Sequence, residues 1–573
     1  MPENYYLDNP DIAFQLKHLD LEQVVAMREH DYAQAEQFPD APESLDDAID
    51  SYDQVLAMVG EICGDHIAPR AEDVDKDGAS LENGTVSYAP GTRENLEDLA
   101  KAQLMGVMIP RQYGGLNMPV TVYSMMTEMV SRADASLQNL FGLQDIAETI
   151  NRFGTEEQKA HYLPQFATGE ADGAMALTEP EAGSDLQAVQ LKAHYDEKTN
   201  KWYLNGMKRF ITNGCAKVLL VLARSEEGTK DGRGLSMFVC ERCPELVVRR
   251  IEDKLGIHGS PTCELQFNEV PAEIVGARRR GLTRYVMSLM NGARVAISSQ
   301  ALGVAEAAYR EAHDYARERE QFGKPIIKFP AVYDMLTHDK VHIMAARALL
   351  YETTRQVDLR DCYEERNAQA DKPDPMMRKL GKYHSRIAAA LTPLSKAFCT
   401  ELANKVAYDC IQIHGGTGYM RDFPAERLYR DARITNIYEG TTQLQYVAAI
   451  GGVIQRVLDP LMDELSQMPY EGKLRRLASA VDMARQKVQR AAHYVDDRDD
   501  SEYFSLMAGR LCEMEMNTFA CYLLLRDALK DKRREAVAEC FVSDTRMLVD
   551  AYYEVVTSGD VSLIDDHEDI LAL

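Results

Sequence analysis

The chain has few positive charges for its size. Its 64 lysine and arginine residues are outnumbered by 91 aspartate and glutamate residues, which gives a formal net charge of −27 over 573 residues. A negative excess of this size argues against nucleic acid or an anionic membrane surface as a partner. It does not prevent an anionic small molecule from binding, because such a ligand needs only a local cationic patch.

Long apolar runs are also missing. No stretch approaches the length of a transmembrane helix, so we do not expect membrane association. The N-terminus from Met1 to Asp11 has no basic region followed by an apolar one, which argues against a secretory signal and an arginine-rich transit peptide. These features favour a cytoplasmic location.

Several motifs that would mark other classes of protein are absent. The 11 cysteines have no framework spacing, as expected for reduced thiols in a cytosolic protein. Cys240 and Cys243 form a CxxC, but a zinc site would need a second pair, and we assign no metal ligand. No Gly-x-Gly-x-x-Gly follows a strand, so a Rossmann fold is not supported, and no P-loop, His-Glu-x-x-His or Gly-x-Ser-x-Gly is present.

Apolar periodicity divides the first half of the chain into an extension at residues 1–45, a helical region at 46–170 and a strand-rich region at 171–278. The first helix is expected from Ser44 to His66, where Pro69 lies just beyond its end. Short strands separated by turns favour a compact β-barrel or sandwich. The expected strands are Leu191–Tyr195, Trp202–Leu204, Val218–Ala223, Ser236–Val239 and Cys263–Phe267.

Helical spacing returns in residues 279–460 and continues to the C-terminus. Long helices are expected at residues 295–316, 331–360, 377–416 and 443–457. Residues 461–573 carry two further apolar seams with three-four spacing, at 474–495 and 504–525, and a third helix at 536–556. Such seams pack helix on helix. We therefore expect an α+β multidomain fold: a helical domain, a β domain, a second helical domain and an extra helical bundle.

The stretch from Asn436 to Gln445 combines the features of a catalytic loop. Glu439 stands between an aromatic residue and a glycine, and burial beside apolar bulk would raise the pKa of its carboxyl group, which suits a general base. Gly440 allows close approach of the backbone to a ligand, and Thr441 and Gln443 offer a hydroxyl and an amide. The alternative is a turn before a helix, with Thr441 as its N-cap.

A second polar stretch runs from Ala176 to Asp185. Gly183 frees the backbone for a ligand, and Thr178 and Ser184 supply uncharged hydroxyl groups. A loop with a helix cap is the alternative interpretation of these residues.

The succession Tyr-Glu-Gly-Thr around Glu439 resembles the catalytic loop of the acyl-CoA dehydrogenase family. Other stretches resemble further motifs of that family and follow in its order, over about residues 45–457; they are residues 176–185, 210–214, 291–294, 317–323 and 412–419. The resemblance implies a flavoprotein that uses FAD to convert an acyl-CoA to the trans-2-enoyl-CoA, as in β-oxidation. It implies electron transfer to an electron-transferring flavoprotein, with Glu439 as the base. Some members carry their base before the arginine of the 291–294 element, where this chain has Ala293.

The same resemblance implies the remaining site residues. FAD contacts are expected at Leu177, Thr178, Gly183, Ser184, Phe210, Thr212, Thr441 and Gln443, and contacts to a neighbouring subunit's FAD at Arg319, Gln321, Phe322, Gln412, Gly415 and Gly416. Substrate contacts are expected at Ser184, Ser225, Asn291, Arg294 and Gly440. Phe210 and Asn291 replace the commoner Trp and Asp of the family. For Phe210 the alternative is packing in the core. Residues 254–260 resemble a further turn of the family, and His258 in it is either a ligand group or a structural hydrogen-bonding residue.

Three other functions stay open at this point. A flavin oxidase on the same fold would pass electrons to dioxygen, a decarboxylating dehydrogenase would act on a dicarboxylyl-CoA, and a non-catalytic member would serve as an assembly partner. In family members with a C-terminal bundle, the bundle covers the surface that a second dimer would use. We therefore expect a homodimer.

Overall fold

The computed structural model describes residues 3–370, 372 and 374–573. These residues divide into two compact units. The first unit comprises the chain up to residue 10 together with residues 28–304 and 426–434, and the second comprises residues 11–27, 305–425 and 435–573. The helix α10 (Met287–Glu318) begins in the first unit and continues into the second.

The first unit begins with helices, as the periodicity predicts. A two-stranded hairpin, β1 (Ser80–Glu82) and β2 (Thr85–Ser87), interrupts them. The helices are α3 (Leu45–Glu61), α4 (Ala68–Asp77), α5 (Pro90–Lys101), α6 (Val120–Ala133), α7 (Ala135–Phe141), α8 (Asp145–Phe153) and α9 (Glu156–Thr168).

The expected end of the first helix at His66 is wrong. A π-helical turn, Ile62–Ile67, joins α3 directly to α4. Pro69 therefore lies in the first turn of α4, where the missing N–H of a proline is tolerated. The wider π turn accommodates the irregularity within one continuous helical path.

A seven-stranded sheet follows these helices in the first unit. Its strands are β3 (Gly173–Ala176), β4 (Lys192–Asp196), β5 (Lys201–Thr212), β6 (Val218–Arg224), β7 (Leu235–Glu241), β8 (Leu246–Ile251) and β9 (Thr262–Ile274). They run in the order β3-β6-β4-β5-β9-β7, with β8 paired to β9. An additional antiparallel pairing of β6 with β7 closes the path into a barrel. Only the pairings of β6 with β3 and β4 are parallel.

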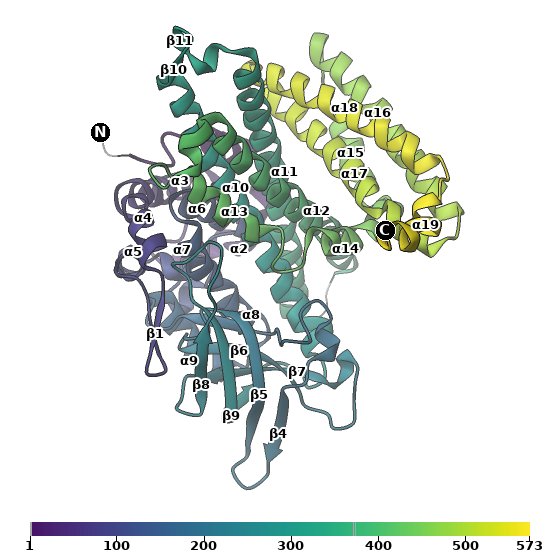
Figure 1. Cartoon of the computed structure of the whole chain (residues 1–573). Coiled ribbons are helices and arrows are strands. Elements are labelled where there is room, and N and C mark those ends of the chain that lie inside the picture. The colour runs from purple at the N-terminus through teal and green to yellow at the C-terminus, as the bar shows by residue number, and fades with distance from the viewer. Residues whose placement is uncertain (1–2, 371, 373) are drawn as a thin grey trace. The chain divides into compact units, whose positions relative to one another are not determined.

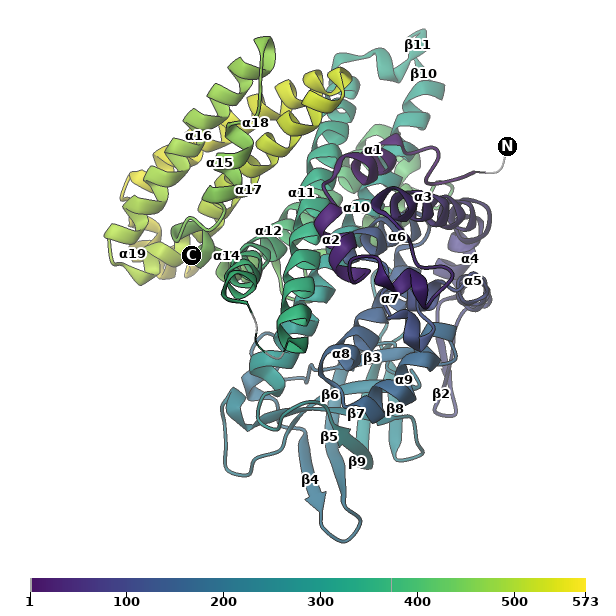
Figure 2. The same cartoon turned by 180° about the vertical axis from the view of Figure 1, so that it is seen from behind.

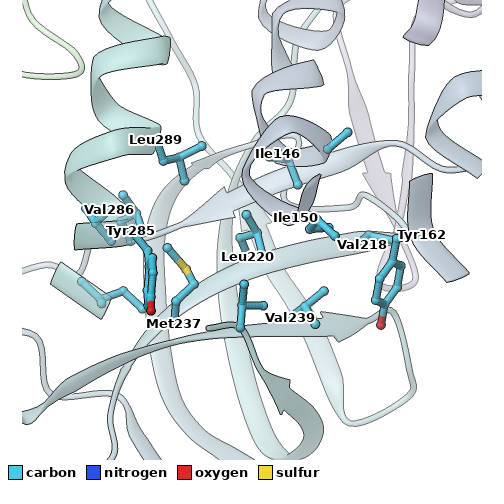
Figure 3. Close-up of a cluster of buried hydrophobic side chains, with 14 of the residues drawn as sticks. Ile146, Ile150, Tyr162, Val218, Leu220, Met237, Val239, Tyr285, Val286 and Leu289 are labelled. Carbon is cyan, nitrogen blue, oxygen red and sulfur yellow. The ribbon is translucent and has the colours of Figure 1, made fainter. Parts of the chain in front are cut away.

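The central strand β6 is buried on both faces. Val218, Leu220 and Leu222 pack in one cluster with α8 and α9, while the alternate residues Leu219 and Val221 pack inside the barrel. Figure 3 shows Ile146 and Ile150 of α8 pointing toward Leu220, with Val239 and Leu289 beside them. The outer face of β6 therefore joins the barrel to α8 and α9, while its inner face fills the barrel.

The second unit is helical, with one small hairpin, β10 (Glu320–Gln321) and β11 (Lys324–Pro325). Its helices are α1 (Pro10–His18), α2 (Glu22–Arg28), α11 (Pro330–Gln369), α12 (Pro375–His414), α14 (Thr442–Ile454), α15 (Asp459–Ser466), α16 (Gly472–Asp497), α17 (Ser501–Lys530), α18 (Glu535–Thr557) and α19 (Ser562–Leu571), while α13 (Ala425–Thr435) lies mostly in the first unit. Within the second unit, α16, α17 and α18 lie side by side as the expected bundle, and α14 packs on α17 (Figures 1 and 2).

A buried charge cluster fastens the N-terminal segment to the second unit. Asp11 of α1 is 7% exposed. Its carboxylate lies 3.2 Å from the guanidinium of Arg347, 3.2 Å from Lys340 Nζ and 2.8 Å from Arg534. These partners come from α11 and from the turn before α18, so α1 joins α11 to the C-terminal bundle.

The helices within the described part of the chain include none with the length and apolar character that a membrane span needs.

Candidate functional site

The loop that carries Glu439 has an unusual backbone. Glu439 and Gly440 both adopt positive φ, at 53° and 92°. A non-glycine residue in this region is uncommon and marks a position held by its surroundings, which makes it a candidate for function. The side chain of Glu439 is half-buried. Gly440 meets the backbone requirement without strain, as expected from its missing side chain.

Two buried side chains hold this loop. Lys396 of α12 is fully buried and donates from Nζ to the carbonyl oxygen of Gly440 at 2.7 Å and to that of Thr435 at 3.2 Å. Gln445 of α14 donates from Nε2 to the carbonyl oxygens of Glu439 at 3.2 Å and Gly440 at 2.8 Å. Both residues act on backbone oxygens, so they fix the path of the chain and leave the carboxylate of Glu439 to other partners.

Thr441 has the capping role that the alternative interpretation gave it. It is the N-cap of α14, and its hydroxyl accepts a hydrogen bond from the N–H of Leu444 at 3.4 Å. Gln443, in the first turn of α14, is exposed. The cap places the N-terminus of α14 directly after Glu439 and Gly440, and therefore helps to fix the loop.

A second group of expected residues surrounds a hollow of about 570 Å³ in the second unit. Arg319, Gln321 and Gly416, which come from two separate motifs, line it together with Tyr315, Ile326, Ile413, His414, Thr417 and Met420. Gly415 has a φ of 64°, and a side chain at Gly415 or Gly416 would meet no atom within 4 Å. The backbone there is therefore open to a ligand. Phe322, at the hairpin tip, is 95% exposed, and Gln412 is exposed on α12.

Two residues that sequence reasoning did not assign shape this hollow. The rings of Tyr315 and His414 stack with centroids 4.1 Å apart, and the hydroxyl of Tyr315 lies 3.1 Å from that of Thr417. His414 Nε2 lies 3.2 Å from a carboxylate oxygen of Glu311. The aromatic wall and its polar supports come from α10, from α12 and from the 3₁₀ turn Gly415–Tyr419 that follows α12. His414 lies in the motif at residues 412–419, but the sequence of that motif does not indicate that its ring stacks on Tyr315.

In the first unit, the stretch from Leu177 to Ser184 is a turn built on a buried ion pair. Lys208 Nζ donates to Glu179 Oε1 at 2.9 Å and to the carbonyl oxygen of Leu177 at 2.7 Å. Both carboxylate oxygens of Glu179 also accept backbone N–H groups, from Gln190 at 2.7 Å and Leu191 at 2.9 Å.

Burial lowers the pKa of the Lys208 ammonium to about 8, although Glu179 acts against that shift. Through the hydrogen bond from Lys208 to the carbonyl oxygen of Leu177, the pair fixes the backbone at Leu177 and Thr178. Gly183 and Ser184 are exposed, and a side chain at Gly183 would meet no atom within 4 Å.

Phe210 points outward from the barrel. It is 51% exposed and has a φ of 61°, at an irregularity in the pairing of β5 with β9 between Lys208 and Ile211. Such a bulge bends a strand and redirects a side chain. The guanidinium of Arg209 lies 4.6 Å from the ring centroid. Core packing of Phe210, the alternative raised from the sequence, is therefore not what the structure shows, whereas Ile211 beside it is buried and Thr212 is half-buried.

The residues expected to contact the substrate differ in their hydrogen-bond partners. Ser225 is 7% exposed, and its hydroxyl lies 2.7 Å from that of Ser236 and donates to Glu226 at 3.2 Å. Arg294 is also buried and donates to the side-chain oxygen of Asn291 at 3.2 Å. The hydroxyl of Ser225 is thus already engaged within the first unit, whereas Asn291 and Arg294 act as a pair on α10.

His258 has a structural role, because both of its ring nitrogens contact protein oxygen atoms. Its Nδ1 lies 2.9 Å from a carboxylate oxygen of Asp75, and its Nε2 lies 2.8 Å from the carbonyl oxygen of Lys254. Hydrogen bonding to Asp75 raises the pKa of the imidazole to about 9. Arg430 pairs with the same carboxylate at 2.6 Å. All four residues lie in the first unit, where they join α4 to the turn at residues 254–258 and to α13.

Family models of the acyl-CoA dehydrogenases match three consecutive parts of the chain: the N-terminal domain at residues 50–170, the middle domain at 174–270 and the C-terminal domain at 280–451. An acyl-CoA dehydrogenase of Bacillus subtilis is 36% identical over 394 residues, which are 68% of this chain and 94% of that protein. The chain therefore belongs to the acyl-CoA dehydrogenase family and is an oxidoreductase of that class. The family and the fold class expected from the sequence are confirmed.

Two further similarities cover more of the chain. A 3-methylmercaptopropionyl-CoA dehydrogenase of Ruegeria pomeroyi is 34% identical over 481 residues, which are 78% of this chain and 76% of that protein. The crystal structure of an acyl-CoA dehydrogenase complexed with FAD from Bacillus anthracis has a TM-score of 0.75 at 23% identity, with 88% of each chain covered. This second likeness shows a shared fold that extends beyond the residues matched by the family models.

Proposed function

We propose that the chain catalyses α,β-dehydrogenation of an acyl-CoA thioester to the trans-2-enoyl-CoA, with FAD as cofactor and Glu439 as the catalytic base. The observation that carries this proposal is the loop of Glu439. The backbone of Glu439 has a positive φ. Lys396 and Gln445 donate four hydrogen bonds to the carbonyl oxygens of residues 435, 439 and 440 and so fix the position of the carboxylate. A base that must reach a carbon-bound proton needs such fixed placement.

The described residues fit FAD in both units. The hollow beside Gly415 and Gly416 is open on the glycine side and carries the exposed guanidinium of Arg319, which suits a pyrophosphate. In the first unit, the outward aromatic ring of Phe210 offers a face for a flat ring system. FAD, when bound, would supply the acceptor for the two electrons and the hydride of the reaction.

The contacts are assigned from the sequence motifs. For FAD bound in the same subunit they are Leu177, Thr178, Gly183, Ser184, Phe210, Thr212, Thr441 and Gln443, and for the FAD of a neighbouring subunit they are Arg319, Gln321, Phe322, Gln412, Gly415 and Gly416. A homodimer in which residues 319–322 reach the other subunit agrees with the exposure of the hairpin tip. Ser184, Ser225, Asn291, Arg294 and Gly440 are assigned to the substrate.

Each protein group then has one role in the reaction. The carboxylate of Glu439 takes the proton from Cα and becomes a carboxylic acid, as the hydride leaves Cβ. The backbone N–H of Glu439 donates to the thioester carbonyl, because the oxygen gains negative charge as Cα loses its proton.

The acceptor test separates this function from its oxidase alternative. The protein is reduced anaerobically with each member of a panel of short, branched, aromatic and thioether acyl-CoA substrates, and then mixed with aerated buffer or with an electron-transferring flavoprotein. We expect slow reoxidation in air while product is bound, and fast reoxidation by the flavoprotein. Stoichiometric hydrogen peroxide at the full turnover rate would establish an oxidase instead. Absence of bleaching with every substrate would contradict the proposal.

A further inference from the structure

A group of polar side chains that the proposed reaction does not use lies where α11 faces α18 in the second unit. His338 comes from α11, and Cys540 and Asp544 come from α18. One ligand atom of each lies within 4.8 Å of the others. Cys540 and Asp544 are four residues apart, so they share one face of α18. Two adjacent helices therefore bring an imidazole, a thiol and a carboxylate together.

The imidazole of His338 is oriented for metal binding. Its Nδ1 lies 2.8 Å from the carbonyl oxygen of Asp334, one turn earlier on α11. A neutral histidine that donates Nδ1–H to a carbonyl presents its lone pair on Nε2. This Nε2 lies 3.5 Å from Asp544 Oδ2. A metal-binding histidine commonly uses its other ring nitrogen in this way.

One carboxylate oxygen of Asp544 has no hydrogen-bond donor among the described residues. Within the part of the chain that the structure describes, its Oδ2 is buried and accepts no hydrogen bond. A protonated His338 would form an ion pair with it, but 3.5 Å is long for a hydrogen bond between charged groups. A buried acceptor without a donor costs free energy. A bound cation would provide a partner for Asp544 Oδ2. It would also be bound by the thiol of Cys540, which takes no part in an ion pair between His338 and Asp544.

The imidazole of His338 gives this group contact with solvent. His338 is 43% exposed and lines a hollow of about 400 Å³ together with Asp334, Met335, Asp339, His342, Leu402, Lys405 and Asp409. The ring of His342 lies against Phe541, with centroids 5.2 Å apart. His342 is therefore packed beside the group, and it is not part of the set that lies within 4.8 Å. Three protein ligands would leave one position of a tetrahedral ion for water.

We propose that His338 Nε2, Cys540 Sγ and an oxygen of Asp544 bind one divalent transition-metal ion, of which zinc fits the donor set best. Imidazole and thiolate ligands select zinc-like ions over Mg²⁺ and Ca²⁺, which prefer oxygen ligands. The thiol of Cys540 releases its proton to solvent on binding. Tetrahedral zinc needs ligand atoms roughly 3.3–3.8 Å apart, given its bond lengths. Small side-chain rotations provide that spacing, and water completes the coordination.

The site links the long helix α11 to the last large helix of the bundle. An ion that binds only the folded chain stabilises it, by an amount that grows with the ratio of its concentration to its dissociation constant. The proposed site therefore gives the bundle a metal-dependent attachment that is independent of the Glu439 loop.

The test uses the full-length protein after chelator treatment. Zinc is titrated in competition with a chromophoric chelator, and cobalt is added as a spectroscopic probe of a thiolate ligand. We expect one tight site per chain and a thiolate-to-cobalt absorption band. We also expect that His338→Ala, Cys540→Ser and Asp544→Ala each weaken binding by at least about 10-fold to 100-fold, the range known for groups that only orient ligands. Circular dichroism and flavin content report whether each variant is folded.

Matched controls identify the site. His313→Ala, at a surface histidine of α10, and Cys243→Ser, at the CxxC, should leave affinity and the cobalt band unchanged. Zinc should raise the melting temperature of the wild type and not that of the triple variant His338→Ala/Cys540→Ser/Asp544→Ala. Equal zinc affinity in the wild type and the triple variant would overturn the proposal. Loss of binding in Cys243→Ser with retention in Cys540→Ser would overturn it in favour of the CxxC.

Discussion

Replacement of Lys396 by methionine tests whether the loop of Glu439 is held from beneath. The ammonium group is fully buried and donates to Gly440 O at 2.7 Å and Thr435 O at 3.2 Å. Hydrogen bonds from a charged donor contribute about 1.5–3 kcal/mol each. Burial of an ammonium costs several kcal/mol, and methionine removes that cost while it keeps the apolar stem. The two effects oppose each other, so we expect the free energy of unfolding to change by no more than about 2 kcal/mol.

Catalysis should respond more strongly than stability. Gly440 O keeps its bond from Gln445, but the loop loses one of its two anchors, and a displacement of about 1 Å can lower a rate by about 100-fold. We therefore expect the rate of flavin bleaching by saturating acyl-CoA to fall by about 10-fold to 100-fold in Lys396→Met. Lys382→Met, at an exposed lysine on the same helix, is the control and should bleach at the wild-type rate. A Lys396→Met rate within twofold of the wild type would refute the positioning role.

Three further predictions concern stability and assembly. The pKa of His258 is raised to about 9, so its contribution to folding is fully present below pH about 6.5 and is lost as the pH rises through about 9. Urea midpoints of wild type and His258→Gln should converge between those values, and a constant difference would contradict this. Asp11→Asn removes the carboxylate charge that pairs with buried Arg347 and Arg534, although Arg347 keeps its ion pair with Glu306, and it should lower the unfolding free energy by about 3 kcal/mol. Asp20→Asn, at an exposed carboxylate nearby, should have little effect. A chain that ends after Pro460 uncovers the faces of α11 and α14 that α17 covers, and light scattering should detect association where the full chain gives a dimer. A monodisperse truncated protein would count against that packing, and a tetrameric full chain against the dimer.

The regular elements could be predicted because their sequence patterns are strong. The seams at residues 474–495 and 504–525 became α16 and α17, and the apolar run at 218–223 became the doubly buried strand β6. Strands β3 and β8 were not predicted. β3 consists of Gly-Ala-Met-Ala, whose small residues have low strand propensity, and its place depends on parallel pairing with β6, which no local pattern indicates.

The candidate site was predictable only in part, for a related reason. The motifs led to Glu439, Arg319 and Gly416, because each lies in a short stretch of recognisable chemistry. The residues that hold them were missed. Lys396 lies 43 positions before Glu439 and appears in the sequence as one lysine in an amphipathic helix, and its role depends on the folded path of the chain. The Pro69 error has the same origin, since a π turn has no simple sequence signature.

The most direct test of the central claim is the reductive half-reaction of Glu439→Gln. Glutamine has nearly the size of glutamate but cannot accept the proton from Cα. The variant should keep its FAD and bind acyl-CoA with an affinity close to that of the wild type. We expect the rate of anaerobic flavin bleaching to fall by about 10²-fold to 10⁴-fold, the range for loss of a general base. Bleaching of Glu439→Gln at the wild-type rate, with the same acyl-CoA, would contradict the assignment of Glu439 as the base.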